Sequence, residues 1–328
     1  MGKKFFLAGV FVVVLFCPAL ADSQPGFYVK ENKIYAPGGE ELIMRGVNKM
    51  FVWNDKEGTN MAEIAKTGAN TVRIVWAIKD GTAEELDRLI GLCAGFGMVP
   101  MIELHDKKCK WDDDVFTELT AYWTSPEVVE VIKKHDKYLF LNYGNEIGDW
   151  RVGHLDFIEK YSKAVNDLRT AGIRVPIVID GVKCGQDIDF YYIAAEEILK
   201  ADPEKNIIYS LHPWWQEKTV ERIQDALEHA KYVKVPLIIG GFAPFGANCS
   251  KGYRYDTVIE ECEKRGIGWL AWSWGPGNSD CAAMDMTKDG MFKSLFGWGE
   301  EVALTSRYSI KNTSKTIEYM KQFASRDR

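Results

Sequence analysis

Eight short apolar runs, separated by amphipathic segments, constrain the fold of this chain more than any other feature. Each run is rich in Val, Ile and Leu, as in parallel strands that are buried on both faces. Between two of the runs, Leu86, Leu89 and Ile90 recur with the period of a helix. The runs cover residues 42–47, 71–76, 99–104, 138–143, 175–179, 207–211, 237–239 and 269–272. Strands that alternate with helices in this way predict an α/β fold, a single (β/α)8 TIM barrel.

The remaining segments predict how the barrel is completed. Residues 26–29 and 33–35 predict a short N-terminal β-hairpin, and residues 313–323 predict a closing helix. The alternative architecture is an open doubly wound sheet, but no Gly-rich phosphate loop follows any of the runs. No linker or low-complexity run interrupts the chain, so residues 22–328 predict one domain.

The first 21 residues predict a secretory signal peptide. They combine a basic start, an apolar core of about a dozen residues and an Ala-Leu-Ala end. The core is too short to span a bilayer, which disfavours a membrane anchor, and the bulky Phe16 disfavours a lipid anchor on Cys17. We therefore expect the mature protein to be secreted, either outside the cell or into a periplasm, with no membrane partner after cleavage.

The charge and the cysteine content limit the classes of ligand and partner that we expect this chain to bind. A net charge of −6 gives no basic footprint for nucleic acid. Cysteines of an exported chain form disulfides, and we expect a bond between Cys249 and Cys281 because they follow neighbouring strands, with the other connectivity open. Cys93 and Cys262 lie in helix-like segments and are expected to be buried thiols. No cysteine pair has the short spacing of a zinc site, and no cofactor and no protein partner is predicted.

The ends of the strands carry the candidate site, because a (β/α)8 barrel places its chemistry just after them. Carboxylates, amides and guanidinium groups hydrogen-bond sugar hydroxyls, and tryptophan faces stack on sugar rings. Glu146 suits a general acid/base, and Asn145 suits a hydroxyl contact. The polar and aromatic residues at these ends are Arg45, Asn48, Arg73, Trp76, Glu103, His105, Asp106, Asn145, Glu146, Asp180, His212, Trp214, Trp215, Trp272 and Trp274.

Retaining cleavage of a glycosidic bond requires a second carboxyl group roughly 5–5.5 Å from the first. The strand opposite Glu146 in the predicted barrel covers residues 237–239 and ends in Gly240-Gly241. The sequence therefore presents one of the two carboxylates that this chemistry needs.

Several motifs together resemble those of glycoside hydrolase family 5, and most closely its bacterial endo-β-1,4-mannanases. The resemblance covers nearly the whole mature chain, and it implies a barrel that acts on β-mannan or a related β-1,4-glycan. The expected partner is therefore a β-1,4-linked polysaccharide or oligosaccharide, with mannan favoured. The motifs lie at residues 26–29, 44–48, 65–75, 103–106, 145–146, 168–173, 268–274 and 310–314.

The resemblance also implies a role for individual residues. Glu146 matches the family's acid/base, with Asn145 beside it, and Arg73 matches the arginine that supports the nucleophile. The residues expected to contact the sugar are His105, His212, Trp274 as the platform at the cleavage point, and Trp53 on the first loop.

The departures from the family pattern gather in one place. The family motif Gly-Glu-Phe-Gly, which carries the nucleophile, reads Gly240-Gly241-Phe242-Ala243 here, so Gly241 marks a vacant nucleophile position. Trp214 replaces a tyrosine that meets the nucleophile, and it either forms a new stacking surface or fills the vacated space. Two further replacements are Ile147 and Cys184, each at a position where the family has tryptophan.

These departures leave competing hypotheses for the function. Ordinary retaining hydrolysis is disfavoured, because the loss of one catalytic group costs orders of magnitude in rate. The alternatives are a non-catalytic glycan-binding protein, inverting attack by water beside Gly241, and a substitute acid at Asp280 or Asp180. Without a neighbouring carboxylate, Glu146 is expected to lack its usual pKa tuning.

The buried charges raise two further points. Arg73 needs either solvent or another acid, such as Glu103, because an unpaired buried charge costs several kcal/mol. A metal held by His105 with Glu103 and Asp106 is less favoured than hydrogen bonding to the sugar. His212 lies on a strand that is not adjacent to that of His105, so shared ligation is disfavoured.

Overall fold

The computed structural model of the chain describes residues 1–2 and 26–325. The predicted signal peptide, apart from its first two residues, therefore lies outside the described residues. None of the helices in the described part is long and apolar enough to cross a membrane.

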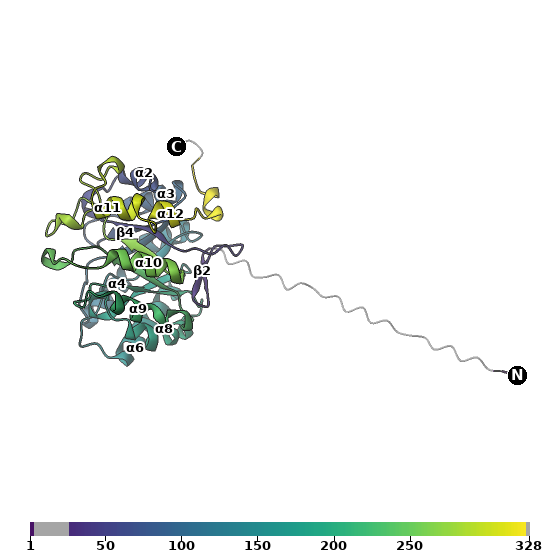
Figure 1. Cartoon of the computed structure of the whole chain (residues 1–328). Coiled ribbons are helices and arrows are strands. Elements are labelled where there is room, and N and C mark those ends of the chain that lie inside the picture. The colour runs from purple at the N-terminus through teal and green to yellow at the C-terminus, as the bar shows by residue number, and fades with distance from the viewer. Residues whose placement is uncertain (3–25, 326–328) are drawn as a thin grey trace.

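Eight parallel strands close into a barrel in the order β10-β3-β4-β5-β6-β7-β8-β9, which confirms the predicted architecture (Figure 1). Every residue of these strands is buried, because helices cover the outer face and side chains fill the interior. The strands are β3 (Arg45–Lys49), β4 (Thr71–Trp76), β5 (Val99–Leu104), β6 (Phe140–Asn142), β7 (Ile177–Asp180), β8 (Ile207–Leu211), β9 (Leu237–Phe242) and β10 (Gly268–Ala271).

Helices lie on the outside of the barrel (Figure 1). The longer ones are amphipathic and pack their apolar faces on the strands. The helices are α1 (Phe51–Asn54), α2 (Asn60–Ala65), α3 (Ala83–Gly95), α4 (Asp113–Trp123), α5 (Pro126–Lys134), α6 (His154–Thr170), α7 (Val182–Gly185), α8 (Asp189–Ala201), α9 (Val220–Glu228), α10 (Tyr255–Arg265), α11 (Trp298–Glu300) and α12 (Ile310–Thr313). Short 3-10 segments occupy Ala230–Tyr232, Ala247–Cys249, Ala282–Met284, Phe292–Ser294 and Glu318–Gln322, and a π-helical turn occupies Glu301–Thr305.

The predicted hairpin is present as an antiparallel pair, β1 (Tyr28–Lys30) and β2 (Lys33–Tyr35). It packs at the N-terminal end of the barrel, where the side chain of Asn206 accepts from the Val29 amide and donates to the Phe27 carbonyl. Phe27 and Ile34 join an apolar cluster inside the barrel with Met101, Phe140, Val178, Ile208, Ile238 and Leu270. This cluster closes the N-terminal end and leaves the opposite end for polar groups.

The predicted helix over residues 313–323 is wrong. The chain instead forms α12, an extended stretch and a 3-10 segment at Glu318–Gln322. Side chains from other parts of the chain occupy backbone groups that a helix would use: Asn70 Nδ2 donates to the Lys315 carbonyl, and Glu40 accepts from the amide of Glu318. Tertiary hydrogen bonds therefore override the local pattern.

Two disulfides connect loops at the C-terminal ends of the strands. The predicted bond between Cys249 and Cys281 is present, and a second bond joins Cys109 to Cys184. Cys93 and Cys262 are buried free thiols, as expected.

Candidate functional site

A cavity of about 530 Å³ opens at the C-terminal ends of the barrel strands. It brings together six of the nine residues that the sequence predicts for the site. The predicted residues in its wall are His105, Asn145, Glu146, His212, Trp214 and Gly241. Three other predicted residues, Trp53, Arg73 and Trp274, do not line it.

Glu146 lies in the loop that follows β6, and its backbone conformation aims the carboxylate into the cavity. Its φ is 51°, in the left-handed region that residues other than glycine enter at a cost. Hydrogen bonds hold this conformation: the Glu146 amide donates to Asp180 Oδ2 at 2.9 Å, and its carbonyl accepts from the Cys109 amide at 2.8 Å. The strained backbone is thus fixed from the end of β7 and from the loop after β5.

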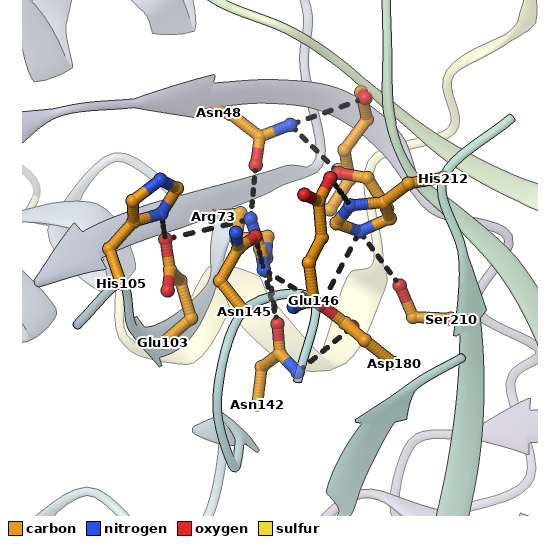
Figure 2. A network of polar contacts seen from close by, with 12 residues as sticks. Asn48, Arg73, Glu103, His105, Asn142, Asn145, Glu146, Asp180, Ser210 and His212 are labelled. Atoms are coloured by element: carbon orange, nitrogen blue, oxygen red, sulfur yellow. Dashed lines mark hydrogen bonds and ion pairs between the residues drawn. The ribbon is translucent and has the colours of Figure 1, made fainter. Parts of the chain in front are cut away.

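The buried Glu146 carboxylate is paired with the side chains of His212 (Figure 2) and Lys108. His212 Nδ1 donates to Oε1 at 2.8 Å, and Lys108 Nζ lies 3.0 Å from Oε2 in an ion pair without hydrogen-bond geometry. Burial by itself raises the pKa of Glu146, but the hydrogen bond and charge of His212, together with Lys108, outweigh it and lower the pKa to about 2. The group is therefore a carboxylate at neutral pH, in line with the expected loss of tuning.

Arg73 lies beneath the cavity in a buried polar network (Figure 2). Its guanidinium donates to the side-chain oxygens of Asn48, Asn142 and Asn145, and the bond to Asn145 Oδ1 is 3.0 Å long. Two buried carboxylates balance its charge: Glu103 Oε1 lies 3.6 Å away and Asp180 Oδ2 lies 3.5 Å away. The charge of Arg73 was expected to be compensated either by solvent or by another acid. The structure shows buried acids beside a guanidinium that is not exposed to solvent.

His105 organises the aromatic side of the cavity. Its Nδ1 lies 3.0 Å from Glu103 Oε1, and its ring stacks on Trp272 with centroids 5.5 Å apart and planes at 18°. Trp53 meets the His105 ring edge-on at 5.8 Å, and its Nε1 donates to Asp80 Oδ2. Trp53 is thus positioned at the edge of the aromatic group, outside the cavity wall.

The assignment of the aromatic platform to Trp274 is corrected by the structure. The Trp274 indole is fully buried, and its Nε1 donates to the Gly290 carbonyl at 2.8 Å. Trp272 lines the cavity instead, with its Nε1 donating to Asn278 Oδ1 at 2.9 Å. Trp272 was among the strand-end candidates, but the choice between the two tryptophans was wrong.

Gly241 lies near the C-terminal end of β9 and borders the cavity beside His212. A Cβ at this position would be 3.7 Å from His212 Nδ1, which is an ordinary contact, so the first carbon of a side chain fits here without a clash. Trp214 is half-buried in the same wall and meets the Tyr253 ring edge-on at 5.5 Å. Of the two acids weighed as substitutes, Asp280 lines the cavity, whereas Asp180 is fully buried below it.

Sequence reasoning missed Lys108 and the disulfide from Cys109 to Cys184. Lys108 lies in a loop rather than at a strand end, and no local signal distinguishes it from a solvated lysine. The described residues contain no group of three or more His, Cys, Asp or Glu side chains arranged to hold a metal ion.

Comparisons with known proteins agree with this geometry. The family model described as cellulase (glycosyl hydrolase family 5) matches residues 35–278. A mannan endo-1,4-beta-mannosidase from Cellvibrio japonicus is 26% identical over 95% of this chain and 73% of its own length. One from Salipaludibacillus agaradhaerens is 27% identical over 88% of this chain and 94% of its own.

Solved structures give the same result. The beta-mannanase of Thermomonospora fusca, in complex with mannohexaose, superposes with a TM-score of 0.82 at 26% identity, over 91% of this chain and 99% of that one. The family model extends over more than half of the chain, and all eight strands of the barrel lie within the matched region. The chain therefore belongs to glycoside hydrolase family 5.

Proposed function

We propose that this protein binds β-1,4-linked glycans of the mannan type in the cavity and has lost retaining hydrolysis. One observation carries the proposal: β9 presents Gly241 to the cavity, where the resemblance to mannanases places the nucleophilic carboxylate. Relatives named as mannan endo-1,4-beta-mannosidases, and a related beta-mannanase in complex with mannohexaose, support this class of ligand.

The state of Glu146 supports the loss of hydrolysis independently. A general acid works best when its pKa lies near the operating pH, and retaining glycosidases raise it for that purpose. Here His212 and Lys108 outweigh the effect of burial and lower the pKa of Glu146 to about 2. A carboxylate held in this way has no proton to donate to a leaving sugar at neutral pH.

The rest of the cavity remains suited to holding a sugar. The stacked pair of His105 and Trp272 offers an aromatic face, and such faces contact the C–H side of a sugar ring. Asn145 and Lys108 lie in the same wall and supply groups that bond hydroxyls. Recognition therefore survives in this proposal although the second catalytic carboxylate is absent.

A second candidate is inverting hydrolysis, in which a water is activated by a base across the sugar. The observation that favours it is the place of Asp280 in the cavity wall. An inverting pair needs carboxyl groups roughly 6.5–9.5 Å apart and a protonated acid. The lowered pKa of Glu146 makes this candidate the weaker one.

The proposal includes export. The N-terminal segment has the pattern of a signal peptide, and the two disulfides suit an oxidising compartment. Retention of the mature chain in the cytoplasm after expression in its own host would contradict this part.

The test combines binding and turnover. The mature protein is incubated with mannohexaose, and with an aryl β-mannoside whose leaving group needs no proton, with and without azide or formate. We expect binding of mannohexaose without cleavage, and release of the aryl group only when the small anion replaces the missing nucleophile. Glu146→Gln serves as the control, because it keeps the shape of the site and removes the carboxylate. Cleavage of mannohexaose without additive, lost in this control, would overturn the proposal.

A further inference from the structure

A second hollow lies next to the main cavity, between the starts of α6 and α8. Its volume is about 390 Å³, and its wall includes Trp150, His154, Lys183, Asp187 and Ile193. This size falls within the range of small-ligand sites. The hollow is therefore suited to a small or extended ligand.

The two hollows share a wall formed by residues 182–187. Cys184 and Gln186 line the main cavity, whereas Lys183 and Asp187 line the second hollow. The disulfide from Cys109 to Cys184 fixes this wall to the loop after β5. Residues 182–187 therefore contribute side chains to both hollows.

Trp150 is the most unusual residue of the second hollow. Its side chain is 77% exposed, and no hydrogen bond or ring contact joins it to another described residue. Ile193, in the same wall, is 52% exposed. Exposed apolar groups that gather in a hollow mark binding sites more often than isolated ones do.

The polar groups of the hollow decide which ligand suits it. Lys183 Nζ and Asp187 Oδ2 form an ion pair at 2.6 Å, and Asp189 also lines the hollow. An indole face beside charged donors and acceptors matches a sugar ring, which has an apolar C–H face and a rim of hydroxyls. A lipid or an apolar peptide would offer no hydrogen-bonding groups to these charged side chains.

We propose that the second hollow binds one end of a β-1,4-linked glycan whose other end occupies the main cavity, with Trp150 as its stacking surface. This inference rests on the proposed function and extends it from one cavity to a track across residues 182–187. A chain that is long enough to reach both hollows gains the second contact without a second loss of translational freedom. Longer oligosaccharides therefore bind more tightly than short ones.

The test measures the affinity for mannotriose and mannohexaose by calorimetry in the wild type, Trp150→Ala and Tyr232→Ala. Tyr232 is the matched control, because it is an aromatic side chain that is 70% exposed and lies outside both hollows. We expect Trp150→Ala to weaken mannohexaose binding about tenfold, or about 1.4 kcal/mol, and to leave mannotriose binding unchanged. Tyr232→Ala should change neither affinity.

Three other outcomes would overturn the inference. Unchanged mannohexaose binding in Trp150→Ala removes the role of the second hollow, while the proposed function stands. Equal losses for both oligosaccharides exclude a chain that spans the two hollows. Failure of the wild type to bind either oligosaccharide refutes the proposed function, and the inference with it.

Discussion

Replacement of Gly241 by glutamate tests how the cavity determines the ionisation of Glu146. A Cβ at position 241 meets His212 ring atoms at 3.7 to 3.9 Å, so the backbone accepts a residue with a side chain here without a clash at Cβ. The added carboxylate would face Glu146 across the cavity, as in a retaining pair, where the two groups stand roughly 5–5.5 Å apart.

The magnitude follows from the charges. Two unit charges at that separation, with an effective dielectric constant of about 20, repel each other by about 3 kcal/mol. This energy corresponds to about two pKa units. We therefore expect the pKa of Glu146 to rise from about 2 to roughly 4 in the variant.

The assay is a pH titration of the glutamate carboxyl carbons by NMR, with Gly241→Gln as the uncharged control. Only Gly241→Glu should move the titration of Glu146 upward. Hydrolysis of mannan should stay low in this variant, because a pKa of roughly 4 is still far from neutral and Trp214 replaces the expected tyrosine. An unchanged Glu146 titration would refute the electrostatic reasoning, and robust hydrolysis would show that Trp214 is no obstacle.

Three further predictions concern stability and recognition. Because the pKa of Glu146 is lowered below the ordinary value of 4.5 for a glutamate, its stabilising effect is full above that pH and declines as the pH falls toward 2. The difference in melting temperature between the wild type and Glu146→Gln should therefore shrink over this range, and a constant difference would contradict the pairing. Replacing Cys109 and Cys184 by serine opens a loop with a sequence separation of 75 and should lower the unfolding free energy by about 4 kcal/mol in urea titrations. Trp272→Ala should weaken mannohexaose binding about tenfold, whereas Trp274→Ala should lower the melting temperature, and the reverse pattern would restore the original assignment.

The barrel was predictable because its strands are buried on both faces. The runs at residues 71–76, 99–104 and 207–211 coincide with β4, β5 and β8. The prediction for β9 ended too early, at residue 239, because Gly240 and Gly241 carry no strand signal of their own. Pairing with β10, through Ala271 and Phe242, continues the strand beyond them.

The site was predictable where residues directly follow a strand. Glu146 and His212 were found by that rule, since a barrel gathers the ends of all its strands around one mouth. The rule failed for the tryptophans, because β10 ends at Ala271 and strand alternation does not continue through Trp272 and Trp274. Lys108 lies at the site because of the path of its loop. That path is determined by tertiary contacts, which the local sequence does not reveal.

The two disulfides bind the rim of the cavity at separate places. One joins the loops after β5 and β7, and the other joins the loops after β9 and β10. Segments that are fixed before a ligand arrives lose little conformational entropy when it binds, and this loss is a main cost of association. The joined loops also need no closing step of their own, and slow conformational steps of this kind lower association rates. Because the disulfides form during folding, the joined loops are already ordered when a ligand arrives. A mobile rim would lose conformational entropy at each binding event.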